Sequence, residues 1–283
     1  MTDAVARFLF EELDIHGSLV QLESSWQAMT AGRGLAAVAR DLLGEMAAVT
    51  TLLGNRLKTP GRLSFQLQGH GAIRLMVVDC DQRLHLRAMA KAPALLAPAP
   101  VPELLGDGRL TLTLQPEDGG PTYQSFVPIA GAAIAAIFEH YLAQSEQQPA
   151  RLWLHADAAS ACGLLLQKLP HADERDADGW QRIQQLAATL RPHELSLAPA
   201  ELLTRLFPEE TIRLFTPRAV RHHAPRDEQK VLDMLRGLGR AEVESILAEH
   251  GEVAIHDEMG NHDYRYGPEI VERLFGAASR TLH

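Results

Sequence analysis

Apolar residues recur at helical or strand spacing along most of the chain, and this pattern predicts where its elements lie. Segment 3–13 places Val5, Phe8, Leu9 and Leu13 on one helical face, so a first helix is expected there, ending at His16-Gly17. Further helices are expected over ranges 35–57, 132–145, 180–190, 202–207, 227–238 and 242–250. Alternating or continuous apolar runs predict strands at 19–22, 63–67, 73–78, 84–88, 110–114, 151–155, 163–169 and 212–215.

Turn signals connect neighbouring strands directly, without a helix between them. Gly69-His70-Gly71 and Asp118-Gly119-Gly120 are typical of hairpin turns. Near the C-terminus, Val253 and Ile255 occupy alternate positions, and after a turn Tyr264 and Tyr266 do the same. This pattern predicts a further hairpin. Antiparallel strands with segregated helices indicate the α+β class rather than alternating βαβ units. The expected architecture is an N-terminal antiparallel-sheet domain with packed helices, a helical linker, and a small C-terminal α+β hairpin domain.

A composition change at Pro170 suggests how the chain divides. The acidic segment 171–179 is typical of a solvated connector, and Pro217 and Pro225 bracket a second connector. These signals predict an N-terminal domain over 1–170, a linker over 171–221 and a C-terminal domain over 222–283.

The linker contains two amphipathic helices. Their apolar side, here called the linker face, consists of Trp180, Ile183, Leu186, Leu190, Leu202, Leu203, Leu206 and Phe207. One interpretation is that this face packs permanently on the large domain, as most amphipathic helices do, and periodicity favours it. The other is that docking is reversible, and that undocking exposes a contiguous apolar surface suited to unfolded protein.

Composition and charge narrow the class of protein. The chain has 283 residues, a formal net charge of −9 and 46% hydrophobic residues, which is ordinary globular composition. The negative balance argues against nucleic acid and anionic membranes as partners. Range 35–57 carries four charged residues and is therefore not expected to span a membrane. The N-terminus lacks a secretory signal pattern, so a cytoplasmic protein is expected.

Reactive residue types form no strong catalytic pattern. Six of the 13 histidines lie in the last 62 residues, at positions 222, 223, 250, 256, 262 and 283, and Asp257 and Asp263 stand beside two of them. Histidine and carboxylate can bind a divalent metal, but four of these residues flank one short turn, so a solvated polar turn is favoured. Cys80 and Cys162, the two cysteines, lack the surroundings of a nucleophile. No enzyme activity is expected.

Several segments, taken in order, resemble the heat-shock protein 33 family of redox-regulated bacterial holdase chaperones. They are RFLFE (7–11), HGSLV (16–20), QLQGHG (66–71), GLLLQKLP (163–170), LFPEE (206–210) and EVESILAEHGE (242–252). The resemblance runs nearly end to end. It implies a helical linker folded over an N-terminal α+β domain, a small zinc domain, dimers, and unfolding client proteins held without ATP.

The chain departs from the family at its zinc ligands. The resemblance implies that four thiolates hold zinc in typical members, and that oxidation to two disulfides releases the metal and unfolds the linker. Here His222, Ala224, Asp257 and Gly260 occupy the four positions. No disulfide switch is therefore expected, and zinc is expected to be absent unless His223, His256 or His262 supply a new geometry.

Three hypotheses remain. The first is a thiol-independent holdase that is constitutive or gated by heat or by acid through its clustered histidines. The second is a non-chaperone scaffold protein on the same fold. The third is a metal-dependent hydrolase using His222, His256, Asp257 and His262.

Overall fold

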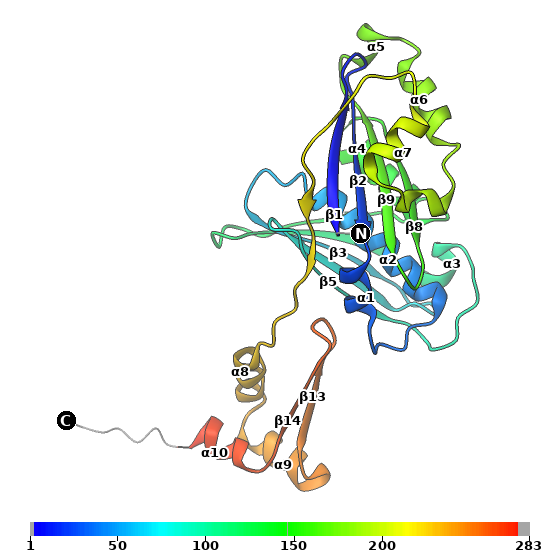
Figure 1. The fold of residues 1–283 in the computed structure, drawn as a ribbon. Helices are drawn as coiled ribbons and strands as arrows, with labels where there is room; N and C mark the ends of the chain where they lie inside the picture. The colour runs from blue at the N-terminus through cyan, green and yellow to red at the C-terminus, as the bar shows by residue number, and fades with distance from the viewer. Residues whose placement is uncertain (1–2, 146, 277–283) are drawn as a thin grey trace, which may run out of the picture. The chain divides into compact units, whose positions relative to one another are not determined.

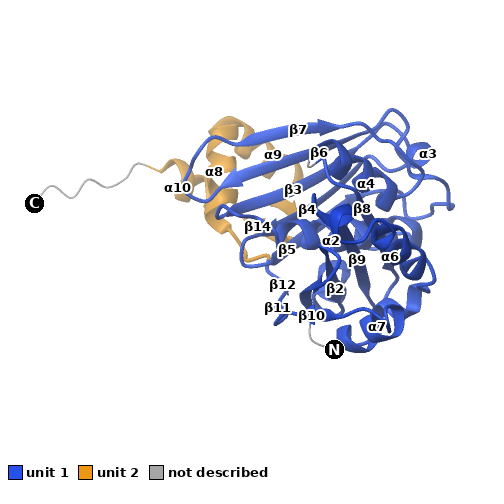
Figure 2. Cartoon of the chain, turned by 90° about the horizontal axis from the view of Figure 1, so that it is seen from above, with its two compact units in different colours: residues 1–223 blue, residues 224–283 orange. Residues whose placement is uncertain are grey.

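The computed structural model describes residues 3–145 and 147–276 and confirms the α+β class (Figure 1). The chain forms two compact units that divide between His223 and Ala224, and each is described by itself (Figure 2). Unit 1 contains two six-stranded sheets, and unit 2 contains a two-stranded hairpin with helices. Within the described ranges no helix is both long and apolar enough to cross a lipid bilayer.

The first sheet of unit 1, sheet A, has the strand order β10-β1-β2-β9-β8, and β11 also pairs with β1. All of its pairings are antiparallel. Its strands are β1 (Ala4–Phe10), β2 (Ile15–Leu22), β8 (Ala150–Ala156), β9 (Ala161–Lys168), β10 (Ile212–Leu214) and β11 (Arg218–Ala219). The sheet therefore joins the two ends of unit 1, since β1 and β10 are neighbours.

The second sheet, sheet B, has the order β12-β5-β4-β3-β6-β7. Its strands are β3 (Gly61–Gln68), β4 (Leu75–Asp81), β5 (His85–Lys91), β6 (Arg109–Pro116), β7 (Tyr123–Val127) and β12 (Arg221–His222). The pairings from β5 to β7 are antiparallel, as expected from the turns at 69–71 and 118–120, whereas β12 lies parallel to β5.

Helix α2 (Ala37–Gly54) packs against strands of both sheets and forms the centre of unit 1 (Figure 1). Leu43, Met46, Val49 and Leu52 on this helix are completely buried, because the apolar residues of α2 surround most of its circumference. The expectation of a long buried helix over 35–57 is confirmed. The other helices of this part are α1 (Ser24–Thr30), α3 (Val101–Leu105) and α4 (Ile134–Ser145).

The opposite face of sheet A is covered by the linker helices. These are α5 (Ala172–Arg175), α6 (Gly179–Ala187), the 3₁₀ helix η1 (Pro192–Ser196) and α7 (Pro199–Leu206). Strand β9 shows the consequence in its side chains. Leu165 joins the cluster around α2, whereas Leu164 and Leu166 join the cluster under the linker. Burial on both faces explains why β9 is a continuous apolar run rather than an alternating one.

Residues 212–223, here called the linker strap, follow the linker helices and cross from sheet A to sheet B. Strands β10 and β11 pair with β1, and β12 then pairs with β5. The strand expected at 212–215 is confirmed by β10. The second connector between Pro217 and Pro225 is more ordered than its composition suggested, because β11 and β12 find partners in the two sheets.

Unit 2 has its own hydrophobic core. Its elements are α8 (Glu228–Leu238), α9 (Arg240–His250), β13 (Val253–Asp257), β14 (His262–Tyr266) and α10 (Glu269–Phe275). The expected helices and hairpin are confirmed, and Gly251 ends α9 in the left-handed conformation (φ 77°). His283, one of the clustered histidines, lies outside the described residues.

One expected element is wrong. Segment 3–13 is not a helix, since Ala4–Phe10 forms β1, and His16-Gly17 lies inside β2 instead of ending an element. Val5, Phe8 and Phe10 are buried on the two faces of sheet A. Pairing on both sides of β1 supplies hydrogen bonds and burial that an isolated helix could not match, so tertiary context overrides the local spacing.

Candidate functional site

The linker face is buried in unit 1. Ile183, Leu202 and Phe207 are 0 to 1% exposed, and Leu203 and Leu206 are similarly buried. Trp180, Leu186 and Leu190 are half-buried and pack at the margin of the same cluster. The structure therefore brings all eight predicted residues together on one surface of sheet A. This agrees with the interpretation that the helices dock on the large domain.

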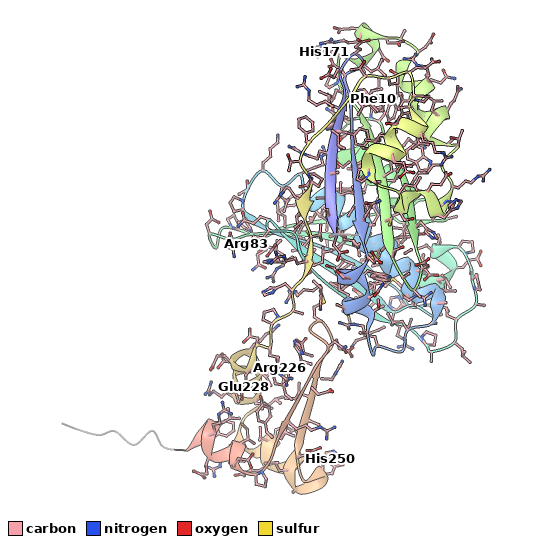
Figure 3. All side chains as sticks on the ribbon, in the orientation of Figure 1. Phe10, Arg83, His171, Arg226, Glu228 and His250 are labelled. Atoms are coloured by element: carbon pink, nitrogen blue, oxygen red, sulfur yellow. The ribbon has the colours of Figure 1, made fainter. Side chains whose placement is uncertain are left out.

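Sheet A supplies the other half of this contact. Phe8 and Phe10 from β1, Ile15 and Leu19 from β2, and Leu164 from β9 belong to the same buried cluster. Phe10, labelled in Figure 3, meets Phe207 edge to face, with ring centroids 5.0 Å apart. Undocking the linker would expose two complementary apolar surfaces, one on the helices and one on the sheet.

Polar side chains anchor the linker at defined points. The amide of Gln21, buried in β2, donates to the carbonyl oxygens of Leu195 (2.7 Å) and Leu197 (2.6 Å). Arg182 on α6 pairs with Glu210 at 2.9 Å and with Asp176 at 2.9 Å. These interactions fix the position of η1 and α6 more specifically than apolar packing alone. Gln21 is not among the residues predicted from the sequence, although a glutamine within an apolar strand is a visible signal of a buried hydrogen bond.

Glu194 strengthens the same part of the linker. It is 7% exposed, its carboxylate accepts from the backbone N–H of Arg191 at 2.7 Å, and it forms an ion pair with Arg205 on α7. A buried carboxylate needs such partners because its desolvation is costly. Glu194 thereby connects η1 to α7 across the linker.

The core of unit 2 is small but continuous. It joins three helices to the hairpin through Val231, Leu232, Leu235, Val243, Val253, Tyr264, Tyr266, Ile270 and Val271. Tyr264 also accepts the backbone N–H of Asp227 on its hydroxyl at 3.0 Å, and Arg226 stacks 4.7 Å from its ring centroid. Asp227 in turn caps α8 by accepting from Lys230 N–H.

Three of the four residues predicted to replace the family's cysteines, Ala224, Asp257 and Gly260, lie in unit 2. Asp257 ends β13, and its carboxylate accepts from the backbone N–H of Met259 at 3.1 Å. A Cβ at Gly260 would stand 2.5 Å from Asp257 Oδ2, so a side chain there would displace that carboxylate. The ring of His262 hydrogen-bonds through Nε2 to the carbonyl oxygen of Ala224 at 2.6 Å. This hydrogen bond connects the segment before α8 to the hairpin.

The fourth position, His222, lies in unit 1 as part of β12. Its backbone N–H donates to Ser25 Oγ at 3.0 Å, and its Nδ1 lies 3.1 Å from Leu86 O. The neighbouring His223 stacks on His85, with ring centroids 4.6 Å apart. Both histidines are therefore engaged with sheet B and its surroundings.

The donor set does not fit a zinc ion of the kind the resemblance implies. The side chains of Ala224 and Gly260 carry no atom that can bind zinc, whereas a structural zinc site requires four side-chain ligands. In the part of the chain that the structure describes, no group of three or more His, Cys, Asp or Glu side chains is arranged to hold a metal. His256, which the hydrolase hypothesis also requires, pairs with Asp263 at 2.8 Å instead. Asp257 and His262 are likewise engaged, with the N–H of Met259 and the carbonyl oxygen of Ala224.

Both cysteines are buried in unit 1 and unpaired. Burial raises the pKa of the Cys80 thiol well above its usual range, and it raises the pKa of Cys162 to about 11. Because the thiolate is the reactive form, neither side chain is suited to rapid oxidation in the folded chain.

Comparison with known proteins identifies the family to which the chain is similar. The model of the Hsp33 protein family matches residues 3–267. The 33 kDa chaperonin of Methylobacillus flagellatus is 38% identical over 278 residues, covering 97% of this chain and 95% of the relative. The 33 kDa chaperonin of Nitrosococcus oceani is 39% identical over 274 residues, covering 96% and 94%.

A solved structure confirms the fold. The crystal structure of the 33 kDa chaperonin (heat shock protein 33 homolog) of Thermotoga maritima superposes with a TM-score of 0.81 at 19% identity, covering 96% of this chain and 97% of that one. The names of the relatives support a chaperone function. With a family match over nearly its whole length, and relatives of similar length, the chain belongs to the Hsp33 family.

Proposed function

We propose that this protein is an ATP-independent holdase of the cytoplasm that binds unfolding proteins through the linker face and the surface of sheet A beneath it. It has no catalytic activity of its own, and its partners are unfolding clients and a second copy of the chain. Its activity is gated by undocking of the linker under heat or a change of pH, not by cysteine oxidation.

The observation that carries this proposal is the docked linker. Five side chains of the linker face are almost fully buried against a sheet that is itself apolar, so a large client-compatible surface is present and covered. Each such side chain contributes roughly 1.5–3 kcal/mol when buried, which makes the docked state favourable but separable by stress. The scaffold alternative requires the same linker to stay docked under all conditions.

In this proposal each of the three predicted parts of the chain has a role. Residues 1–170 provide most strands of both sheets, and 171–221 provide the covering helices together with the edge strands β10 and β11. Residues 222–283 correspond to the family's switch domain, although His222 and His223 lie in unit 1. Since Ala224 and Gly260 carry no donor atom, the last part is expected to fold through its hydrophobic core and hydrogen bonds. We therefore place the control of activity in the stability of the linker contacts.

Light scattering from a thermally unfolding client tests the proposal. The freshly reduced protein and the peroxide-treated protein are both expected to suppress aggregation, and to do so equally, because Cys80 and Cys162 are buried. Suppression in neither state would contradict the holdase proposal and favour the scaffold alternative. Activation by peroxide alone would contradict the thiol-independent gate.

A matched pair of substitutions tests the gate. Gln21→Ala removes two hydrogen bonds that hold η1, at a cost of about 1–2 kcal/mol, without changing any apolar residue of the linker face. Its suppression of aggregation should begin roughly 2–5 °C lower than that of the wild type. The control is Gln27→Ala, since the exposed Gln27 amide donates to Ala159 O at 2.9 Å, away from the linker. Equal onset temperatures in the two variants would contradict linker gating.

A further inference from the structure

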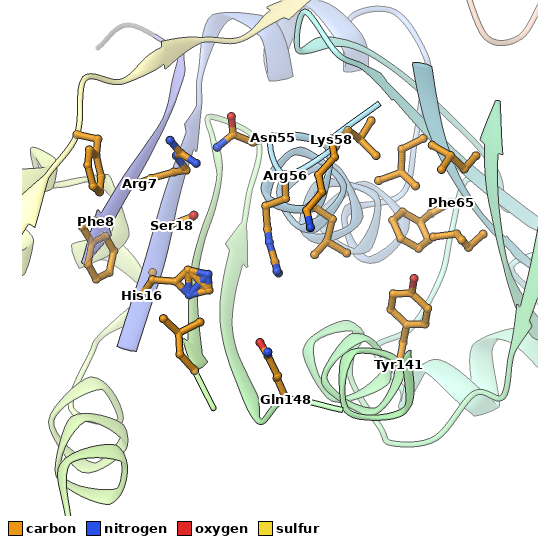
Figure 4. A pocket seen from close by; sticks show the side chains of 18 of the residues that line it. Arg7, Phe8, His16, Ser18, Asn55, Arg56, Lys58, Phe65, Tyr141 and Gln148 are labelled. Carbon is orange, nitrogen blue, oxygen red and sulfur yellow. The ribbon is translucent and has the colours of Figure 1, made fainter. Parts of the chain in front are cut away.

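A cavity of about 1000 Å³ lies in unit 1 where β1 and β2 of sheet A face β3 and β6 of sheet B (Figure 4). The C-terminal end of α2, which lies between the two sheets, also lines this cavity through Leu53 and Asn55. This volume is at the upper end of the range of small-molecule sites. The linker face does not contribute to the lining, and Phe8 is the one side chain that the cavity shares with the sheet A surface under the linker.

The lining divides into an apolar part and a cationic part. The apolar part comes from both sheets and from α4, and includes Leu63, Phe65, Leu112 and Tyr141. The cationic part comprises Arg7, Arg56 and Lys58, and Figure 4 shows all three among the labelled side chains. Arg7 and Lys58 form no ion pair with any residue in the described ranges, although the chain carries a net charge of −9.

Asn55 adds a buried donor to the same lining. It is 8% exposed, and its Oδ1 accepts from the guanidinium of Arg218 at 2.8 Å. Because a guanidinium only donates, this contact fixes which end of the amide is the oxygen. The Nδ2 of Asn55 is buried and has no hydrogen-bond partner among the described residues. A buried donor without a partner is uncommon in folded proteins and indicates a group that a ligand can satisfy.

The chemistry of the lining selects the ligand. An amide N–H, a guanidinium and an ammonium all donate, so they match a head group that only accepts, such as a carboxylate or a phosphate. The apolar part matches a hydrocarbon tail. An extended peptide fits less well, because β1, β3 and β6 are each paired on both sides and offer it no free backbone edge.

We propose that this cavity binds a small amphiphilic anion, with its acidic head group at Arg7, Asn55 and Lys58 and its apolar tail between the two sheets. Arg7 also stacks 5.6 Å from the ring of Phe215, which keeps its guanidinium at the cavity. The ligand can be a free fatty acid or a single-chain lipid, which share this chemistry.

Isothermal titration calorimetry of the full chain tests this, with decanoate as the probe below its micelle concentration. Decanoate is expected to bind saturably at one site. Acetate, which lacks the tail, and decyltrimethylammonium, which reverses the charge, should bind at least about tenfold more weakly. Equal binding of decanoate and decyltrimethylammonium would overturn the proposal, because the cations would then play no part.

Substitutions locate the site. Lys58→Met removes the charge of an exposed side chain and keeps its length. Asn55→Asp keeps the oxygen that accepts from Arg218 but replaces the Nδ2 donor by a carboxylate oxygen. Each should weaken decanoate binding at least about tenfold, with melting temperature as the check on folding. The control Lys230→Met removes an exposed cation in unit 2 and should leave binding unchanged. Wild-type affinity in Lys58→Met, which needs no core rearrangement, would contradict the assigned site.

Vesicles distinguish a free ligand from a lipid surface. Vesicles of phosphatidylglycerol and of phosphatidylcholine are compared with decanoate in the same buffer. One-to-one binding of decanoate without retention on either vesicle supports a free amphiphile, and displacement of decanoate by lysophosphatidylglycerol, a single-chain anionic lipid, supports a lipid source. Binding to vesicles without binding of decanoate would overturn the proposal, because a bilayer cannot enter a cavity of this size. Client binding is not required for any of these readouts.

Discussion

At the scale of single residues, Glu45 couples the stability of unit 1 to pH. It lies on α2, the central helix, and burial followed by repulsion from Asp41 raises its pKa from 4.5 to about 7. The folded chain therefore holds this proton up to neutral pH, whereas the unfolded chain releases it near 4.5. Between these two values the free energy of unfolding falls as the pH rises, and above about 7 the full cost of a buried charge is present.

Glu45→Gln should therefore stabilise unit 1 at pH 8 by an amount on the order of 2 kcal/mol and have little effect at pH 4. Chemical denaturation at the two pH values measures this difference. Asp41→Asn serves as a control, because it removes the neighbouring charge but not the burial, and its effect at pH 8 should be smaller. A Glu45→Gln variant that is equally stabilised at both pH values would show that the side chain acts by packing and not by ionisation.

The two buried thiols show how residue identity limits regulation. Sequence alone established that Cys80 and Cys162 are the only cysteines. Their burial, which makes them unreactive as well as unpaired, depends on the packing of β4 and β9. The number of cysteines can be counted in the sequence, whereas their burial can be seen only in the folded structure.

At the scale of elements, two hydrogen bonds connect the hairpin β13-β14 to the start of unit 2. The 2.6 Å hydrogen bond from His262 to Ala224 O joins this hairpin to the segment before α8. Tyr264 makes a second connection through the N–H of Asp227. These two contacts supply the cross-link that an isolated hairpin and two short helices would otherwise lack.

His262→Ala should lower the free energy of unfolding of unit 2 by about 1 kcal/mol or somewhat more, because a half-buried hydrogen bond is lost and a carbonyl is left without it. Hydrogen exchange at the amides of α8 and β14 in the full chain should accelerate, while those of α2 stay protected. The matched control is His256→Ala, which breaks only an exposed pair with Asp263 and should cost less than about 0.5 kcal/mol. Equal effects of the two substitutions would contradict a structural role for His262.

The element that local pattern predicted wrongly is equally informative. Val5, Phe8, Leu9 and Leu13 have helical spacing, yet Ala4–Phe10 forms a strand, because β2 on one side and β10 and β11 on the other satisfy its backbone. The partners β10 and β11 lie about two hundred residues away in sequence. No local window contains that information.

At the scale of the whole molecule, Ala224 and Gly260 offer no side-chain donor at two of the positions predicted to correspond to zinc ligands, so we predict that the folding of unit 2 does not depend on a metal. Prolonged treatment with a chelator is expected to leave its melting temperature unchanged, as judged by differential scanning calorimetry of the full chain. Adding zinc at a one-to-one ratio should also leave it unchanged. A rise with zinc would contradict this expectation, since a ligand that binds only the folded state must stabilise it.

The sequence by itself determined the α+β class, most of the helices and strands, and the family. It also predicts that His222, Ala224, Asp257 and Gly260 replace the family's zinc ligands. Periodicity, turn residues and motif order are local properties, so they can be read along the chain. Only the tertiary structure decided that β1 is a strand, that Gln21 anchors the linker, that His222 belongs to unit 1, and that Arg7, Asn55 and Lys58 meet around one cavity. Each of these depends on contacts between residues far apart in sequence, where burial and pairing outweigh local preference.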